Sequence, residues 1–241
     1  MSDLIYGIHS VDAAVKSNHV DQLFVCKNRN SEKVIKIIKT AQINKIPISF
    51  MDTFWFKQNF SDNNHQFIAA SRNSESSLKE SLEEFLMKNV TQHFFLILDE
   101  VQDPHNLGAC FRIASAFNLS GIIVPKNNSV GITSVVSKVA SGAVSQIPFF
   151  PVTNLSRTID FLKEHKFFVY AADGYSELSI YEQSFSGNIA LVMGSEGRGI
   201  RRLTKNKCDL TFSIPMTGSI ESLNVSVATG ICVSEIRRKL K

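Results

Sequence analysis

Apolar and polar positions along this chain follow two periods, one typical of strands and one typical of helices. From residue 94 onward, short apolar runs are each followed by a segment whose apolar positions recur every three to four residues. Strands that alternate with helices favour an α/β fold with a largely parallel sheet. The predicted strands are Phe94–Asp99, Gly121–Val124, Phe167–Ala171, Ile189–Met193 and Thr211–Ile214, and the predicted helices are Leu107–Phe117, Thr133–Ala140, Leu155–Glu164, Ile200–Lys205 and Ser222–Leu240.

The first 70 residues predict a smaller α/β unit, and a polar, acidic stretch at 71–89 indicates a linker that leads into a short exposed helix. We therefore divide the chain into an N-terminal domain (1–72), a linker (73–92) and a C-terminal domain (93–241). In the first of these, the predicted helices are Ile8–Val15, Ser31–Lys45 and Thr53–Phe60, and the predicted strands are Gln22–Cys26, Ile46–Phe50 and Gln66–Ala70. The aromatic side chains of 54–60 either pack in a core or stack on unpaired bases.

Composition narrows the possible partners and compartment. With 44% hydrophobic and 20% charged residues in 241, the chain is a packed globular protein, and its formal net charge of +4 permits an RNA partner without requiring one. No apolar run could span a bilayer and no secretory signal precedes the first domain, so we expect a cytoplasmic protein without a membrane partner. The four cysteines are scattered, which predicts free thiols and no metal site.

The candidate site residues lie in three segments, each of which runs from a predicted strand through a loop into a predicted helix. Open α/β sheets bind their ligands at the C-terminal ends of the strands, where these loops begin. Asn106 stands at a predicted helix entrance, where an N-cap is the structural alternative, and Glu196 lies between glycines in GSEGRG, where it could favour a helix dipole. Ser222 and Asn224 could cap the last helix or line a site.

These segments carry a family resemblance. DPHNLGACFRIA, LVMGSEGRGI and SIPMTGSIESLNVSVATG resemble the three signature motifs of the SPOUT-class (SpoU/TrmH) RNA ribose 2′-O-methyltransferases. YGIH and His65–Gln66 are similar to the family's N-terminal RNA-binding domain, which resembles a fold of some ribosomal proteins, although Phe67 stands where the family usually has glycine. The resemblance implies a C-terminal SPOUT domain with a trefoil knot and S-adenosylmethionine as the cofactor.

Residue roles follow from the same resemblance. Matching positions make Asn106, Arg112, Glu196, Ser222 and Asn224 the catalytic set, and Gly194, Ile214 and Leu223 the cofactor contacts. Arg112 corresponds to the arginine that acts on the ribose hydroxyl, whereas taken alone it could be a surface side chain or an ion-pair partner. Glu196 is expected to hydrogen-bond Asn106 or Arg112.

Within the family, the chain is most similar to bacterial enzymes that methylate a guanosine of 23S rRNA. That similarity implies a homodimer whose active site draws on both subunits, with 23S rRNA or a ribosomal precursor as partner and the P-site hairpin loop as target. The alternatives are ribose methylation of tRNA or another rRNA site, and a catalytically silent RNA-binding assembly factor. Two other glycine-loop families fit poorly. GSEGRGI lacks the GK[ST] ending of a Walker loop, and EVQDPHNLG, which follows the first strand of the C-terminal domain, does not match the GxGxxG motif of Rossmann-type enzymes.

Overall fold

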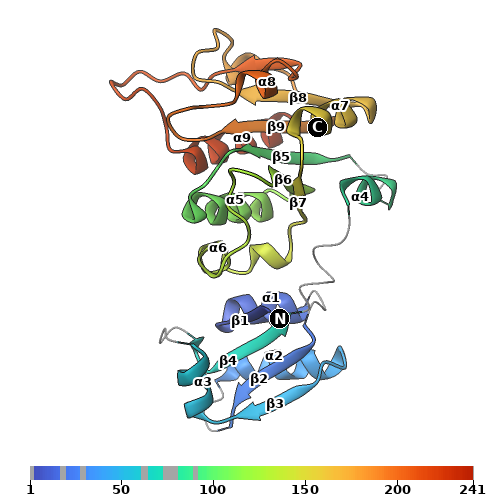
Figure 1. Ribbon diagram of the computed structural model, residues 1–241, viewed down its shortest axis with the longest axis vertical. Coiled ribbons are helices and arrows are strands. Elements are labelled where there is room, and N and C mark those ends of the chain that lie inside the picture. Colours follow the sequence, from blue (N-terminus) through green and yellow to red (C-terminus); the bar gives the residue numbers. More distant parts are fainter. Residues whose placement is uncertain are drawn as a thin grey trace. The chain divides into compact units, whose positions relative to one another are not determined.

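The computed structural model describes residues 3–16, 20–27, 31–60, 65–72, 81–88 and 92–240. The chain forms two compact units (Figure 1), one of Met1–Glu80 with Ser141–Gln146 and the other of Ser81–Ala140 with Ile147–Lys241. Most of the predicted linker lies outside the described residues, apart from its short helix α4 (Leu82–Lys88).

In its described residues, the first unit is a four-stranded sheet with three α-helices, in the strand order β1-β4-β2-β3. β2 and β3 are parallel, whereas β4 is antiparallel to both β1 and β2. The strand β1 was not predicted, and β4 begins two residues later than predicted. The elements are β1 (Asp3–Tyr6), α1 (Ile8–Lys16), β2 (Gln22–Cys26), α2 (Glu32–Ile43), β3 (Ile48–Met51), α3 (Thr53–Asn59) and β4 (Ile68–Arg72).

An aromatic cluster explains how this unit tolerates Phe67 in place of glycine. Phe67 has a φ of 57°, in the left-handed region that bulky residues rarely adopt. Its ring lies edge-on to His65 with centroids 4.6 Å apart, and the Nδ1 atom of buried His65 accepts a hydrogen bond from the Phe67 N–H. Phe56 is fully buried in the same cluster, while Phe54 is 70% exposed and remains available to stack on a base.

The second unit confirms the predicted α/β fold with a parallel sheet. Its six strands lie in the order β10-β8-β9-β5-β6-β7, and every neighbouring pair is parallel. β7, an edge strand containing Pro151, was not predicted. The elements are β5 (Phe94–Asp99), α5 (Pro104–Ala116), β6 (Gly121–Pro125), α6 (Ser134–Ala140), β7 (Phe149–Val152), α7 (Leu155–Glu164), β8 (Phe167–Ala172), the 3₁₀ turn η3 (Ile180–Glu182), β9 (Asn188–Gly194), α8 (Arg202–Lys205), β10 (Leu210–Phe212) and α9 (Val225–Lys239). The 3₁₀ turn η2 (Ala143–Ser145) belongs to the first unit.

Helices pack on the faces of this sheet, and the loops that form the site lie at the C-terminal ends of its strands. Phe95 and Ile97 of β5 join a core with Ile159 and Leu162 of α7, and α4 contributes Leu82 to it. α5 packs against α6 and α9. Because all six strands are parallel, β5, β9 and β10 end at the same edge, where β5 lies beside β9 and β8 separates β9 from β10.

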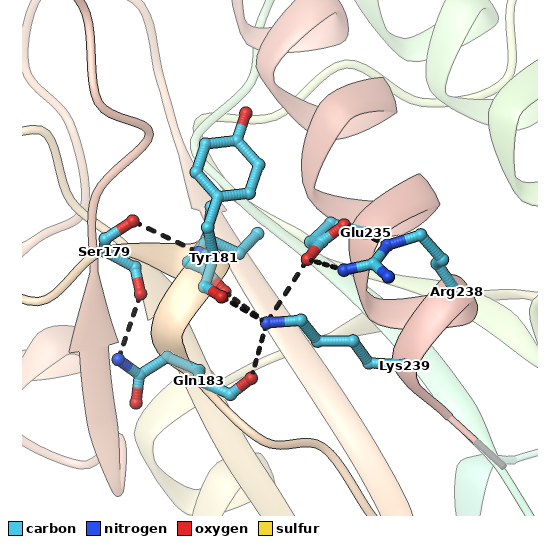
Figure 2. Close-up of polar contacts among 7 residues, drawn as sticks. Ser179, Tyr181, Gln183, Glu235, Arg238 and Lys239 are labelled. Atoms are coloured by element: carbon cyan, nitrogen blue, oxygen red, sulfur yellow. Dashed lines mark hydrogen bonds and ion pairs between the residues drawn. The ribbon is translucent and has the colours of Figure 1, made fainter.

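Polar contacts fasten the end of α9 (Figure 2). The Lys239 ammonium donates to the backbone carbonyls of Tyr181 and Gln183 at 2.6 and 2.8 Å and lies 3.3 Å from the Glu235 carboxylate. Arg238 also binds Glu235, through two hydrogen bonds of 2.8 Å. The C-terminal helix is thereby anchored to the segment that precedes β9.

No helix within the described ranges is long and apolar enough to cross a bilayer. The trefoil knot stays a prediction.

Candidate active site

Side chains from all three motif segments meet in one hydrogen-bond network. The Asn106 side-chain amide donates to Glu196 Oε1 at 3.1 Å. The Asn224 amide donates to Asn106 Oδ1 at 3.0 Å and to Glu196 Oε1 at 2.5 Å. These residues are separated by 28 to 118 positions in the chain, so the fold itself brings them together. The expected hydrogen bond between Glu196 and Asn106 is present.

Asn106 lies in the first turn of α5. The N-cap of that helix is Asp103, whose carboxylate accepts from the His105 N–H at 2.9 Å, and Pro104 begins the helix. The alternative interpretation of Asn106 as an N-cap is therefore wrong. Asn106 is 6% exposed, and both of its side-chain polar atoms are used by the network, as a buried amide requires.

Glu196 stands at the tip of a tight loop, residues 194–201, between β9 and α8. Ser195 and Gly199 exchange backbone hydrogen bonds of 3.2 and 2.9 Å, and Gly197 and Gly199 have φ values of 78° and 67° that glycine adopts without strain. α8 begins only at Arg202, so the helix-dipole alternative for Glu196 is wrong. The glycines turn the chain so that the Glu196 side chain is exposed toward α5 and α9.

Asn224, not Ser222, caps α9. The Asn224 Oδ1 atom accepts from the N–H groups of Ser226 and Val227, while its amide nitrogen serves the network. The helix starts at Val225, three residues later than predicted, and Ser222 and Leu223 belong to the preceding loop. Capping and site formation, which the sequence left as alternatives, are thus combined in one amide. Ser222 is exposed, and within the described residues it makes no hydrogen bond to Asn106, Glu196 or Asn224.

A pocket of about 390 Å³ lies beside the network. Its walls come from the loop after β5, the first turn of α5, the tip of the 194–201 loop and the start of α9. The lining residues are Glu100, Val101, Gln102, Asp103, Asn106, Ser195, Glu196, Arg198 and Val225. Open α/β sheets carry ligands in this position, outside the carboxyl ends of the strands.

Arg112 does not join this network. Six residues of α-helix separate it from Asn106, a rotation of about 600°, so the two side chains leave α5 about 120° apart. Arg112 is exposed, and in the described part of the chain it makes no hydrogen bond to Asn106, Glu196 or Asn224. Its neighbours on this side of α5 are Ala109 and Ala116, so it projects from a surface of small residues.

Of the predicted cofactor residues, Gly194 ends β9, Ile214 lies just after β10 and Leu223 lies just before α9. Gly194 closes β9, where an added Cβ would lie 2.1 Å from the Gly199 carbonyl carbon, so only glycine fits. Ile214 and Leu223 are half-buried at the two ends of the loop that joins β10 to α9. Within the described residues, no backbone hydrogen bond involves 214–223, so their N–H and C=O groups remain available to a ligand.

One buried charge next to the site, that of Asp99, was not predicted. Asp99, the last residue of β5, is fully buried and binds Arg201 at the base of the 194–201 loop. The available signal was a carboxylate ending a strand whose other five residues are apolar. Buried carboxylates require such partners. Within the described part of the chain, no group of three or more His, Cys, Asp or Glu side chains is placed to hold a metal ion.

Comparison with known proteins identifies the family. The profile of the SpoU rRNA Methylase family matches residues 93–234. The chain belongs to this family. A second profile, described as RNA 2′-O ribose methyltransferase substrate binding, matches residues 4–75. The SpoU assignment thus accounts for both parts of the chain.

Individual SpoU relatives cover almost its whole length. The chain is 42% identical over 239 residues to the Shewanella oneidensis 23S rRNA (guanosine-2′-O-)-methyltransferase RlmB, covering 98% of this chain and 97% of the relative. It is 39% identical over 241 residues to RlmB of Escherichia coli K12, covering 99% of each. The structure of the SpoU methyltransferase AviRb from Streptomyces viridochromogenes, in complex with the cofactor AdoMet, superposes with a TM-score of 0.81 at 19% identity, covering 98% of this chain and 89% of AviRb, and supports the fold.

Proposed function

We propose that this protein transfers a methyl group from S-adenosylmethionine to the ribose 2′-hydroxyl of a guanosine in 23S rRNA. The network of Asn106, Glu196 and Asn224 carries the proposal, because it joins the three motif segments beside a pocket at the ligand-binding edge of the sheet. The full-length similarity to RlmB proteins supports the substrate and the reaction.

The loop between β10 and α9 fits the cofactor. S-adenosylmethionine, when bound, supplies an electrophilic methyl group on a sulfonium centre. Ile214 and Leu223 offer half-buried apolar side chains, the backbone of 214–223 offers free donors and acceptors for a nucleoside, and Gly194 permits the close approach of two chain segments. No acidic ribose-binding residue is needed in such a site, which is why none stands out in the sequence.

The network residues hold the target ribose in position. Glu196 Oε1 is already occupied by two amides, which leaves Oε2 to accept from a ribose hydroxyl. Asn224 holds Glu196 from the α9 side, and Ser222 completes the motif set from the loop that precedes α9. Positioning of this kind can lower a barrier by about 7–11 kcal/mol.

Arg112 acts on the phosphate next to the target ribose. An arginine side chain offers hydrogen-bond donors and no acceptor, so Arg112 orients the 2′-hydroxyl through the phosphate and is not itself the base. The hydroxyl proton leaves to phosphate or water. The exposed position of Arg112 suits contact with RNA, whose phosphates bind arginine by charge and bidentate hydrogen bonds.

The protein acts as a homodimer through the outer faces of α5 and α9. Val227 is 51% exposed, and Gly230 and Ile231 share its side of α9, where Gly230 lies beside Ile113 of α5. A surface of small and apolar residues next to Arg112 permits close helix packing with a second copy. In such a dimer Arg112 lies near the subunit interface and can serve the partner's site.

Free cysteines suit a cytoplasmic protein.

The direct test is methyl transfer to RNA. Incubation with tritiated S-adenosylmethionine and unmodified 23S rRNA should label the RNA, and mapping should place one 2′-O-methylguanosine, with the P-site hairpin loop as the predicted position. Label on tRNA or at another rRNA nucleotide would favour the alternative substrates. Binding of RNA without any label would favour a silent assembly factor.

A further inference from the structure

Asp99 is fully buried, and in the described part of the chain the polar partners of its carboxylate all belong to Arg201. It ends β5 and pairs in register with Gly194 of β9, so it lies at the base of the 194–201 loop. Its Oδ2 accepts from the Arg201 backbone N–H at 3.1 Å. Its Oδ1 accepts from Arg201 Nε at 2.8 Å and lies 2.7 Å from Nη2. Both oxygens of this carboxylate are therefore bound to Arg201.

Arg201 closes the loop at the opposite end from Gly194. Its guanidinium also lies 3.2 Å from Glu100, and its side chain is 44% exposed. The hydrogen bond to Asp99 raises the pKa of Arg201 above its ordinary value. Asp99 therefore fixes the main chain and the side chain of the residue where the loop ends, while strand pairing with β5 fixes Gly194 where it begins.

Between these fixed ends the loop has little freedom. Ser195 and Gly199 bond to each other across it, and Gly194 lies against the backbone of Gly199. Glu196 projects from this short ring toward Asn106 and Asn224. A shift of Arg201 would thus move the 194–201 loop, and with it the Glu196 carboxylate, relative to the amides of Asn106 and Asn224.

We propose that Asp99 and Arg201 are positioning residues for methyl transfer, which lock the 194–201 loop so that Glu196 meets Asn106 and Asn224. This inference rests on the catalytic role of Glu196 proposed above. Neither Asp99 nor Arg201 contacts the reacting groups in this account. A misplacement of about 1 Å at a reacting centre can cost about 10²-fold in rate, so a small loop shift is sufficient.

The test is a double-mutant cycle between Arg201→Met and Glu196→Ala. Methionine keeps the apolar stem of Arg201 but removes its charge and all side-chain donors. Single-turnover methyl transfer to 23S rRNA at saturating S-adenosylmethionine is measured for both single variants and the double variant, with thermal unfolding to check the fold. The matched control is Lys163→Met, which breaks a surface ion pair with Asp209 in the same unit at a similar exposure of 39%, and which leaves the 194–201 loop untouched.

If Arg201 acts through Glu196, Arg201→Met slows transfer roughly 10- to 100-fold in the wild-type background, but by less than about 3-fold when Glu196 is already alanine. Arg201→Lys, which keeps one charged contact to Asp99, should restore part of the rate. Lys163→Met should leave the rate unchanged.

A wild-type rate for Arg201→Met, or an equal loss in both backgrounds, would overturn the inference. An equal loss in both backgrounds with lowered thermal stability would mean that the pair only supports the fold. A wild-type rate for Glu196→Ala would instead reject the proposed function of the site, and the inference with it. Loss in Glu196→Ala together with a wild-type rate in Arg201→Met would reject the inference alone.

Discussion

Replacing Asn224 by aspartate separates the two roles that its amide combines. The Oδ1 atom caps α9, and the amide nitrogen binds Asn106 and Glu196. Aspartate is as good an N-cap as asparagine and favours the positive end of the helix dipole, so the cap survives. What is lost is the pair of hydrogen bonds to the network, and a second carboxylate is placed beside Glu196.

The size of each effect can be estimated. A hydrogen bond to a charged group contributes about 1.5–3 kcal/mol, and because Glu196 and Asn224 are exposed we take the lower end, about 1.5 kcal/mol, which corresponds to roughly tenfold in rate. Carboxylate repulsion adds to this, so we expect Asn224→Asp to lose about 10- to 100-fold in turnover. Asn224→Ala should lose the same activity and also about 1 kcal/mol of stability, or about 2–4 °C in Tm.

The assay is tritium transfer to 23S rRNA at saturating cofactor, with thermal unfolding followed by circular dichroism. Ser226→Ala is a control for local change, since its hydroxyl contacts only Asn224 Oδ1 in the described part of the chain. If Asn224→Asp kept wild-type turnover, Asn224 would be a helix cap and nothing more.

Further predictions concern the other site residue, the unusual backbone and the C-terminal anchor. Arg112→Ala should fold and dimerise but lose about 10²–10⁴-fold in turnover; near-normal turnover would reject its role. Phe67→Gly relieves left-handed strain of about 1 kcal/mol but removes a half-buried ring and its contact with His65, so urea denaturation should show a net loss of about 1 kcal/mol; a gain would mean that strain outweighs packing. Hydrogen bonds from Arg238 hold the pKa of Glu235 at about 2, below its ordinary 4.5, so the ionised form stabilises the fold above pH 4.5 and this contribution is lost as pH falls through about 2. The Tm difference between wild type and Glu235→Gln should accordingly be constant above about pH 5 and shrink toward pH 2; a pH-independent difference would reject the assigned contacts.

The main helices and central strands could be predicted because their apolar periodicity reflects burial on the sheet. Phe94–Asp99 was predicted with its observed bounds, since a run of apolar residues ending in a charge marks both ends of a buried strand. The strand Phe149–Val152 was missed because Pro151 argues against a strand, and only its position at the sheet edge makes a proline tolerable.

Asn106, Glu196 and Asn224 could be named together from their motifs, and a bond between Asn106 and Glu196 was expected, but the double use of the Asn224 amide was not. Local pattern offers both Ser222 and Asn224 as caps, and the choice of Asn224 depends on Asn106 and Glu196, which are distant in the chain. The pairing of Asp99 with Arg201 spans 102 positions, so no local signal reveals it. The separation of Arg112 from Asn106 could have been foreseen, because two residues six positions apart lie about 120° apart around a helix and so do not share a face.

The central claim is that the network of Asn106, Glu196 and Asn224 serves ribose methylation. It is tested most directly by mapping the product of the wild-type protein and of Glu196→Ala on unmodified 23S rRNA with S-adenosylmethionine. We predict one 2′-O-methylguanosine with the wild-type protein and a loss of about 10²-fold or more in its rate of formation with the variant. Methylation of a base instead of a ribose, or equal rates for the two proteins, would contradict the account.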